Sequence, residues 1–182
     1  MNPANALTLS RLFIALAVFA MLLAFPPGGL LFIPFLLLVL AGITDILDGH
    51  VARRLNCVTE FGRVADAFID RILAIGCFVV FLQWQLVQIW MVLVILIREL
   101  VTGGMRNLAD ARGLRFSANV FGKTKFASQY AACLAVVLYR ALMEPVGWMR
   151  VAMNVIIYIA VINTFVSGVI YLANYKRLVG HE

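Results

Sequence analysis

Charged and thiol-bearing residues are scarce in this sequence of 182 residues, and both shortages narrow what the protein can be. Only 13% of the residues are charged, whereas 64% are hydrophobic. A water-soluble domain of this composition could not cover its surface with polar groups, so we expect a membrane protein. The three cysteines are widely spaced and there are only two histidines, so the sequence supports neither a disulfide framework nor a zinc site.

Long apolar runs are what the sequence has in abundance, and they predict six transmembrane helices. The runs cover residues 12–25, 30–47, 64–82, 86–105, 120–142 and 148–172, and the first reaches spanning length only with the residues before Leu12. No linker or low-complexity tract divides the chain, and no small-residue cleavage site clearly follows the first run. We therefore expect a single all-α integral membrane domain over residues 1–182, taken as the mature chain.

The basic residues are distributed unevenly between the two sides of this predicted bundle. Of the fifteen Lys and Arg residues, all except Arg140 and Arg150 map to the side of the termini and of the second-to-third and fourth-to-fifth connections. The positive-inside rule places that side in the cytoplasm, as expected of a multi-pass protein of the cytoplasmic membrane. The net charge of +6 suits anionic lipids and phosphates, and there is no soluble basic domain for nucleic acid.

Four aspartates are concentrated where the second predicted helix closes and the third opens, on the cytoplasmic side. Asp45 and Asp48 are three residues apart, and Asp66 and Asp70 are four apart, so each pair lies on one helical face. A short connection makes the two helix ends neighbours, so all four carboxylates can converge. Adjacent carboxylates in a low-dielectric setting need protons or a bound cation, and all-oxygen ligands favour Mg²⁺ or Mn²⁺.

Small and basic residues accompany the aspartates. Gly49 and Ala52 are small enough to let a ligand approach the backbone, and Arg53 can add a planar cation to a phosphate or base. Two other interpretations stay open at this point. The aspartates could be structural partners of nearby arginines, or they could line the pathway of an ion transporter, although the cluster lies near one membrane face and no inverted repeat is visible.

The spacing of these residues resembles the signature of the CDP-alcohol phosphatidyltransferase family. The pattern is Asp45-x-x-Asp48-Gly49-x-x-Ala52-Arg53, eight residues, then Gly62-x-x-x-Asp66-x-x-x-Asp70. This resemblance implies a six-helix membrane enzyme, often a homodimer, in which an alcohol displaces CMP from a CDP-linked lipid. The segment from Asn5 to Arg11 also resembles the N-terminal segment of the family, which lies at the membrane surface.

The same resemblance implies a role for each signature position. Asp45, Asp48 and Asp66 are expected to be metal ligands. Asp70 is expected to be both a metal ligand and the catalytic general base. Two Mg²⁺ or Mn²⁺ ions are the expected cofactors. The expected CDP-lipid contacts are Gly49, Ala52, Arg53, Thr59 and Gly62.

Two later segments resemble the members of the family that make phosphatidylglycerol phosphate. They are Ile97-Arg98-Glu99-Leu100-Val101-Thr102-Gly103, followed by Arg106, and Gly122-Lys123-Thr124-Lys125. Such members usually carry Asp-Pro-x-x-Asp-Lys where this chain has Asp66-Ala67-Phe68-Ile69-Asp70-Arg71. The resemblance implies CDP-diacylglycerol and glycerol 3-phosphate as substrates. Cardiolipin synthase, phosphatidylinositol phosphate synthase and phosphatidylserine synthase activities remain alternatives.

A phosphate-bearing acceptor needs cationic partners, and the second half of the chain supplies them on the side of the aspartates. The candidates are Arg106, Arg112, Arg115, Lys123 and Lys125. An ordinary positive-inside loop is the alternative explanation for them. Arg98 and Glu99 are neighbours that could form only an internal ion pair, or a pair that also positions the site.

Overall fold

The computed structural model is a bundle of six α-helices. It describes residues 3–55, 60–112, 120–142 and 146–179, with side chains at these positions except 3–9, 11, 45–55, 60–67, 70, 110, 120–121, 123 and 178–179. The helices and one 3₁₀ turn are α1 (Pro3–Ala24), η1 (Gly29–Leu31), α2 (Phe32–Leu55), α3 (Glu60–Gln83), α4 (Ile89–Ala111), α5 (Val120–Ala141) and α6 (Gly147–Val179). No strand occurs in these ranges, so the predicted all-α fold and the helix count are confirmed.

Local chemistry explains where the first helices end. The run Pro26-Pro27-Gly28-Gly29 follows α1, and proline both disfavours helix in the residue before it and lacks an N–H to donate. Gly28 has φ 130° and ψ −165°, a conformation that only glycine adopts readily. Between α3 and α4 the turn is made by Gln85, which has φ 58°.

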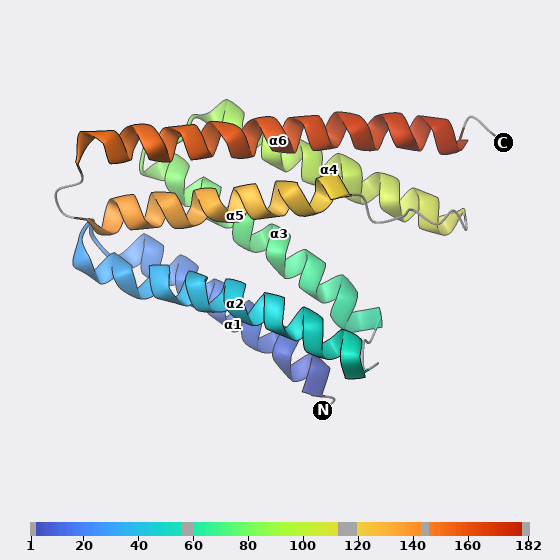
Figure 1. Cartoon of the computed structure of the whole chain (residues 1–182), viewed down its shortest axis with the longest axis horizontal. Coiled ribbons are helices and arrows are strands. Elements are labelled where there is room, and N and C mark those ends of the chain that lie inside the picture. The colour runs from blue at the N-terminus through green and yellow to red at the C-terminus, as the bar shows by residue number, and fades with distance from the viewer. Residues whose placement is uncertain (1–2, 56–59, 113–119, 143–145, 180–182) are drawn as a thin grey trace.

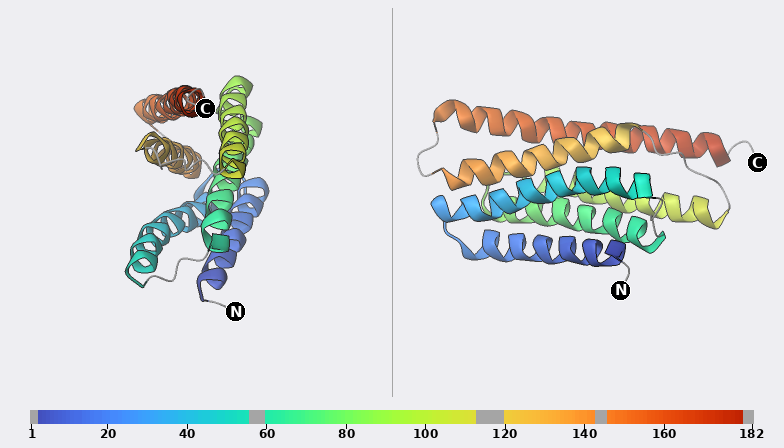
Figure 2. Two further views of the ribbon diagram at one scale, coloured as in Figure 1. Left: turned by 90° about the vertical axis from the view of Figure 1, so that its right-hand side faces the viewer. Right: turned by 60° about the horizontal axis from the view of Figure 1, so that its bottom comes forward.

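The six helices pack in a closed ring around one another. Contacts run from α1 to α2, α5, α6, α4 and α3 and back to α1, and α3 also packs against α5 across the interior. Figure 1 shows the first residues of α1, α3 and α5 and the last residues of α2, α4 and α6 towards one end of the bundle, and the other helix ends at the opposite end. The right-hand view of Figure 2 shows the same arrangement. We call the end that holds the start of α1 the cation-rich end and the opposite end the cation-poor end, after the distribution of Lys and Arg in the sequence.

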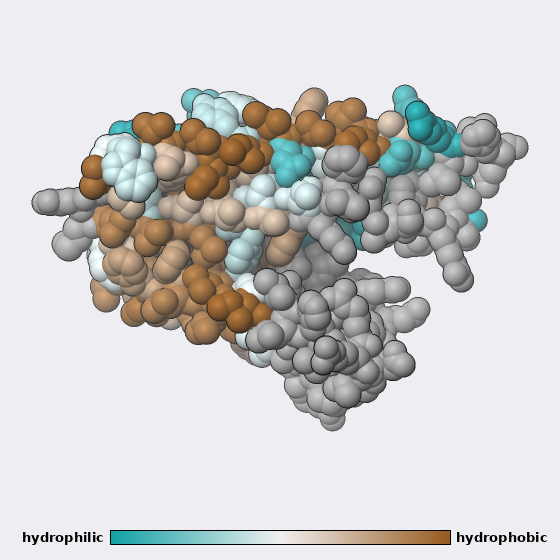
Figure 3. All heavy atoms as spheres, in the orientation of Figure 1, coloured by the Kyte–Doolittle hydropathy of each residue, from teal (hydrophilic) through white to brown (hydrophobic). Residues whose placement is uncertain are grey.

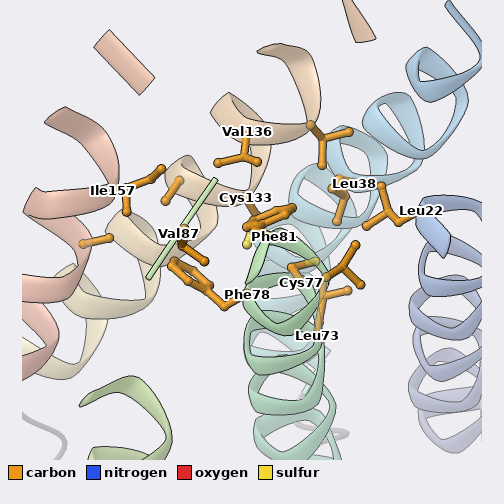
Figure 4. Close-up of a cluster of buried hydrophobic side chains, with 14 of the residues drawn as sticks. Leu22, Leu38, Leu73, Cys77, Phe78, Phe81, Val87, Cys133, Val136 and Ile157 are labelled. Atoms are coloured by element: carbon orange, nitrogen blue, oxygen red, sulfur yellow. The ribbon is translucent and has the colours of Figure 1, made fainter. Parts of the chain in front are cut away.

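The core lies where α3 crosses α5. Phe78 and Phe81 of α3 are fully buried, and Cys77 lies with them opposite Cys133 of α5, as Figure 4 shows. Both thiols are free. Gly76 permits close packing of α3 on α1, because a Cβ atom at this position would overlap the ring of Phe19. Shape complementarity of this kind fixes α3 against its neighbours.

The outer surface of the bundle is apolar. Phe13, Leu100 and Trp148 are each more than 60% exposed, and Figure 3 shows hydrophobic side chains over much of one face, with hydrophilic ones gathered towards the C-terminal end of α6. In the described part of the chain, one helix, Gly147–Arg177, is long and apolar enough to span a membrane, with a mean hydropathy of 2.2. Shorter apolar helices cover Leu12–Ala24, Gly29–Thr44 and Arg71–Gln83. These features indicate a membrane protein, and six spans remain a prediction.

The bounds of the first three helices can be compared with the sequence-based expectation. Residues 5–11 are part of α1, which runs unbroken from Pro3, as expected if the first span includes the residues before Leu12, and their place at the membrane surface stays a prediction. The aspartates do not sit at the helix ends, because α2 continues to Leu55 and α3 begins at Glu60. Polar residues extend both helices beyond the apolar runs, since intrahelical hydrogen bonding does not depend on an apolar side chain.

Candidate functional site

The four signature aspartates lie on two consecutive helices at the cation-rich end. Asp45 and Asp48 belong to the second half of α2, and Asp66 and Asp70 belong to the first half of α3. Their side chains lie outside the described residues. Only residues 56–59 separate Leu55 from Glu60, so the two helix ends lie within roughly 18 Å of each other by chain reach alone. The backbone thus keeps both pairs in one region of the bundle.

The predicted lipid-binding positions belong to the same two helices. Gly49, Ala52 and Arg53 follow Asp48 in α2, and Gly62 precedes Asp66 in α3. Their side-chain positions lie outside the described residues, as does the whole of Thr59. Their roles in lipid binding therefore stay predictions, although those in α2 and α3 lie on the helices that also carry the aspartates.

An apolar cavity of about 470 Å³ opens beside the aspartates. It lies between α1, α2, α3 and α5, and its lining is almost entirely aliphatic and aromatic. Ile43 lines it two positions before Asp45, and Ile69 lines it immediately before Asp70. The cavity therefore reaches the two helix segments that carry the carboxylates. Its chemistry suits a hydrocarbon chain.

Tyr130 forms part of the wall of this cavity. Its hydroxyl donates a hydrogen bond to the carbonyl oxygen of Leu38 in α2, and its ring lies against Gly42. A Cβ atom at position 42 would come within 2.8 Å of Tyr130 Cε1, so a larger residue would push the ring away. This contact could not be predicted from the sequence, because a tyrosine and a glycine 88 positions apart share no pattern.

A cluster of ionic side chains joins three helices near the aspartates. Glu99 of α4 accepts from Lys125 Nζ of α5 and lies 3.5 Å from Arg71 Nε of α3. Arg98 Nη1 also donates to the carboxylate, at 3.1 Å. Glu99 and Lys125 are almost completely buried, whereas 30% of the Arg71 side chain is exposed. Among the side chains that the structure describes, three cations surround this one carboxylate, which leaves that set with an excess of positive charge.

The sixth helix holds the cluster in place through Arg98. Arg98 Nη2 donates to Ser167 Oγ at 2.8 Å. Gly168 leaves room for the arginine stem, because a Cβ atom there would lie 3.0 Å from Arg98 Cγ. The Arg98 Nε atom is buried and has no hydrogen-bond partner in the described part of the chain. Arg98 therefore pairs with its neighbour Glu99 and also ties α4 to α6.

Polar contacts continue from this cluster along the interface between α5 and α6. Gln129 Nε2 donates to Thr164 Oγ1 at 2.9 Å, and both residues are buried. The residues directly before these two form a second bond, in which Asn163 Nδ2 donates to Ser128 Oγ at 3.2 Å. Buried polar pairs of this kind are satisfied only when the helices keep their register. The middle of α5 is thus fixed against α6, whereas Lys125 links the start of α5 to α4.

The predicted acceptor residues are distributed over the same end of the bundle. Arg106 and Arg112 lie in and just after the last turns of α4, and both are exposed. Lys125 is buried against Glu99. The side chain of Lys123 lies outside the described residues, although its backbone belongs to the first turn of α5, and Arg115 lies outside them entirely. The structure therefore gives Lys125 a protein partner, and the phosphate contacts stay predictions.

This arrangement is suited to a reaction on a phosphate-bearing lipid. An apolar cavity, a set of carboxylate-bearing helix segments and a positively charged cluster occur together at one end of the bundle. The cavity can receive a hydrocarbon chain, and the carboxylate-bearing segments can bind hard cations. The positively charged cluster can offset the charge of a phosphate.

Comparisons with known proteins agree with the signature. A family model described as CDP-alcohol phosphatidyltransferase matches residues 1–166. A curated protein from Bacillus subtilis named CDP-diacylglycerol--glycerol-3-phosphate 3-phosphatidyltransferase is 34% identical over 144 residues, which cover 79% of this chain and 74% of the relative. A protein of the same name from Rickettsia bellii is 31% identical over 143 residues, 78% of each chain. Another from Rickettsia typhi is 29% identical over 176 residues, 93% and 94% of the two chains.

Proposed function

Because the chain belongs to the CDP-alcohol phosphatidyltransferase family, we propose that it transfers the phosphatidyl group of CDP-diacylglycerol to glycerol 3-phosphate. The products are phosphatidylglycerol phosphate and CMP. The observation that carries this proposal is the complete aspartate signature on the adjoining segments of α2 and α3. The names of the relatives from Bacillus subtilis and Rickettsia support glycerol 3-phosphate as the acceptor.

The donor set of the site fits a hard divalent cation. Asp45, Asp48, Asp66 and Asp70 supply only carboxylate oxygens, which Mg²⁺ and Mn²⁺ prefer, and we include two such ions in the proposal. When bound, these ions would neutralise the diphosphate of the lipid and stabilise the charge on CMP as it leaves. Asp45, Asp48 and Asp66 act only as ligands.

Asp70 has a second role, as the general base. It accepts the proton of the sn-1 hydroxyl of glycerol 3-phosphate as that oxygen attacks the lipid-proximal phosphorus. The bond between this phosphorus and the CMP oxygen breaks, and CMP takes the bonding electrons. A carboxylate is a weak base, so the proton moves late, when the attacking oxygen has become more acidic.

The CDP-lipid occupies the region between the aspartates and the apolar cavity. Gly49 and Ala52 let the diphosphate approach the α2 backbone, and Arg53 contacts the nucleotide portion, as do Thr59 and Gly62 from the following segment. The cavity bounded by Ile43 and Ile69 receives the first part of an acyl chain. The lipid can then enter from the bilayer without leaving an apolar environment.

The acceptor phosphate is bound by basic residues of the second half of the chain. We place it among Arg106, Arg112, Arg115, Lys123 and Lys125, near the end of α4 and the start of α5. Charge-assisted hydrogen bonds to a dianion are about twice as strong as neutral ones, so several of them select a phosphorylated alcohol. An inositol phosphate, serine or phosphatidylglycerol acceptor is the alternative.

We further propose that the protein is a multi-pass protein of the cytoplasmic membrane and that the site faces the cytoplasm. The exposed apolar surface and the uneven distribution of Lys and Arg support this orientation. The family resemblance supports a homodimer.

The test is an acceptor panel with purified protein. CDP-diacylglycerol in mixed micelles is supplied with Mg²⁺ and with glycerol 3-phosphate, inositol phosphate, serine or phosphatidylglycerol, and CMP release is measured. We expect release to require both the divalent ion and glycerol 3-phosphate. Preference for another acceptor would move the protein to a different branch of the family. In sealed vesicles, metal-dependent ion uptake without CMP release would favour a transporter.

A further inference from the structure

The Glu99 carboxylate of α4 links α3 and α5 close to the proposed acceptor site. It contacts Arg71 in α3, which directly follows Asp70, and Lys125 in α5, which belongs to the predicted phosphate-binding segment. One buried side chain therefore lies between the residue next to the general base and the segment that binds phosphate. Sequence alone paired Glu99 only with Arg98.

The packing of the helices makes this contact important. Within the described ranges, α4 packs against α3 and α6 but has few backbone contacts with α5. The ion pair between Glu99 and Lys125 is therefore a link between α4 and α5 that backbone packing does not duplicate. Arg98 fixes the Glu99 end of this link, because it is bound to Ser167 of α6.

We propose that Glu99 is a positioning residue that sets the separation between the hydroxyl site of the acceptor, at Asp70, and its phosphate site, at the start of α5. The inference rests on the proposed function. Glycerol 3-phosphate must place its hydroxyl and its phosphate at fixed points simultaneously, so a change in this separation weakens acceptor binding. The headgroup of CDP-diacylglycerol binds on α2 and α3, and α5 supplies only one wall of the cavity for its acyl chain, so binding of this lipid depends much less on the separation.

The excess positive charge of the cluster supports the same assignment. Arg71, Arg98 and Lys125 surround a single carboxylate, and Arg71 is the member that remains partly exposed. Without Glu99, the three cations would repel one another and separate. Each would then move away from its present position, including the start of α5.

The experiment compares substitutions of Glu99 with a control in the same layer of polar contacts. Glu99→Gln removes the charge at nearly constant volume, and Glu99→Asp keeps the charge but shortens the reach. Thr164→Val is the matched control, because it breaks the buried bond to Gln129 without touching the ionic cluster. The KM for each substrate, kcat from CMP release, and thermal unfolding in detergent are measured for the full-length protein.

We expect Glu99→Gln to raise the KM for glycerol 3-phosphate about tenfold to a hundredfold, since misplacement by about 1 Å has effects of this size. The KM for CDP-diacylglycerol should change by less than about twofold, and Glu99→Asp should show an intermediate acceptor KM. Thr164→Val should lower thermal stability and leave both KM values unchanged. If Glu99→Gln behaves like Thr164→Val, or raises both KM values equally, the inference is wrong.

A second pair of variants covers the case in which Glu99→Gln does not fold. Lys125→Met removes one of the excess cations, so the carboxylate keeps Arg71 and Arg98 as partners and the fold should survive. Lys125→Met and Glu99→Asp should each raise only the acceptor KM, and their combination should be no worse than the more severe of the two. Multiplied effects, or an unchanged acceptor KM in Glu99→Asp, would overturn the inference. Absence of glycerol 3-phosphate-dependent CMP release in the wild type would instead overturn the proposed function.

Discussion

The two ends of the helix bundle accommodate a partly buried arginine in different ways. At the cation-poor end, Arg140 lies over the ring of Trp84, with its Cζ atom 5.5 Å from the ring centroid, and its carbonyl oxygen accepts from Gly28 N–H at 3.1 Å. At the cation-rich end, Arg98 meets a carboxylate and a hydroxyl, and two more cations share that carboxylate.

This difference indicates that the cation-poor end contributes mainly to stability and that the cation-rich end contributes to the reaction. An aromatic ring and a backbone carbonyl cannot change protonation, so the contacts of Arg140 at the cation-poor end serve only to hold the helices together. Carboxylates and amines at the other end can bind metal or phosphate. We therefore expect substitutions at the cation-rich end to change kinetics and substitutions at the cation-poor end to change stability.

The largest expected effect is that of Asp70→Asn. The amide cannot accept the hydroxyl proton, so kcat should fall about a hundredfold to ten-thousandfold while much of the lipid binding remains. CMP release at saturating Mg²⁺ and binding of CDP-diacylglycerol are the two measurements. Glu144→Gln, which changes a carboxylate outside the signature sequence, is the control and should keep wild-type turnover. A near wild-type rate for Asp70→Asn would show that another group is the base.

Lys123→Ala should have the next largest effect. Loss of one charge-assisted hydrogen bond to the acceptor phosphate costs about 1.5–3 kcal/mol, or roughly a tenfold to hundredfold rise in the KM for glycerol 3-phosphate. The KM for CDP-diacylglycerol should stay nearly constant. Lys176→Ala, an exposed lysine in the last turn of α6, is the matched control and should leave both constants unchanged. Wild-type acceptor kinetics in Lys123→Ala would remove this residue from the phosphate site.

At the cation-poor end, Gly28→Ala should destabilise the protein without changing its kinetics. The φ of 130° is strained for any residue with a Cβ atom, and we expect a loss of about 1–3 kcal/mol in the free energy of unfolding. Thermal unfolding in detergent reports the change. Gly29→Ala is a close control, because a Cβ atom there has no neighbour within 4 Å. Equal stability of the two variants would mean that the strain at Gly28 is relieved by a small shift of the turn.

The smallest effect is expected for Arg140→Met. Methionine keeps most of the apolar stem but loses the attraction to Trp84, which is worth about 0.5–2 kcal/mol. Unfolding should therefore occur at a slightly lower temperature, with both KM values unchanged. Arg150→Met, the exposed arginine at the same end, should have no measurable effect. A more stable Arg140→Met protein would show that burying the guanidinium costs more than the ring contributes.

Much of the fold could be predicted from the sequence, because its elements are set by local composition. The apolar runs gave all six helices, and the Pro-Pro-Gly-Gly segment gave the first break. The boundaries near Asp48 and Asp66 were less accurate, because hydropathy marks where apolar side chains stop and a helix can continue beyond that point.

The candidate site was only partly predictable. The aspartate signature lies within 26 residues and can be recognised from spacing. Two of the partners of Glu99 lie 28 positions before it and 26 after it, and only the three-dimensional arrangement of α3, α4 and α5 reveals them. The contact between Tyr130 and Gly42 was missed because it depends on how two distant helices fit together.

The closed ring of helices has a consequence for biosynthesis. The helix α5 lies beside α2 and supplies one wall of the apolar cavity, although α3 and α4 are synthesised between them. A ribosome that has delivered the aspartates of α2 and α3 to the bilayer has not yet produced Tyr130 or Lys125. The nascent chain therefore cannot enclose a lipid beside its carboxylates until α5 has been inserted, and a truncated product that lacks α5 has no complete cavity.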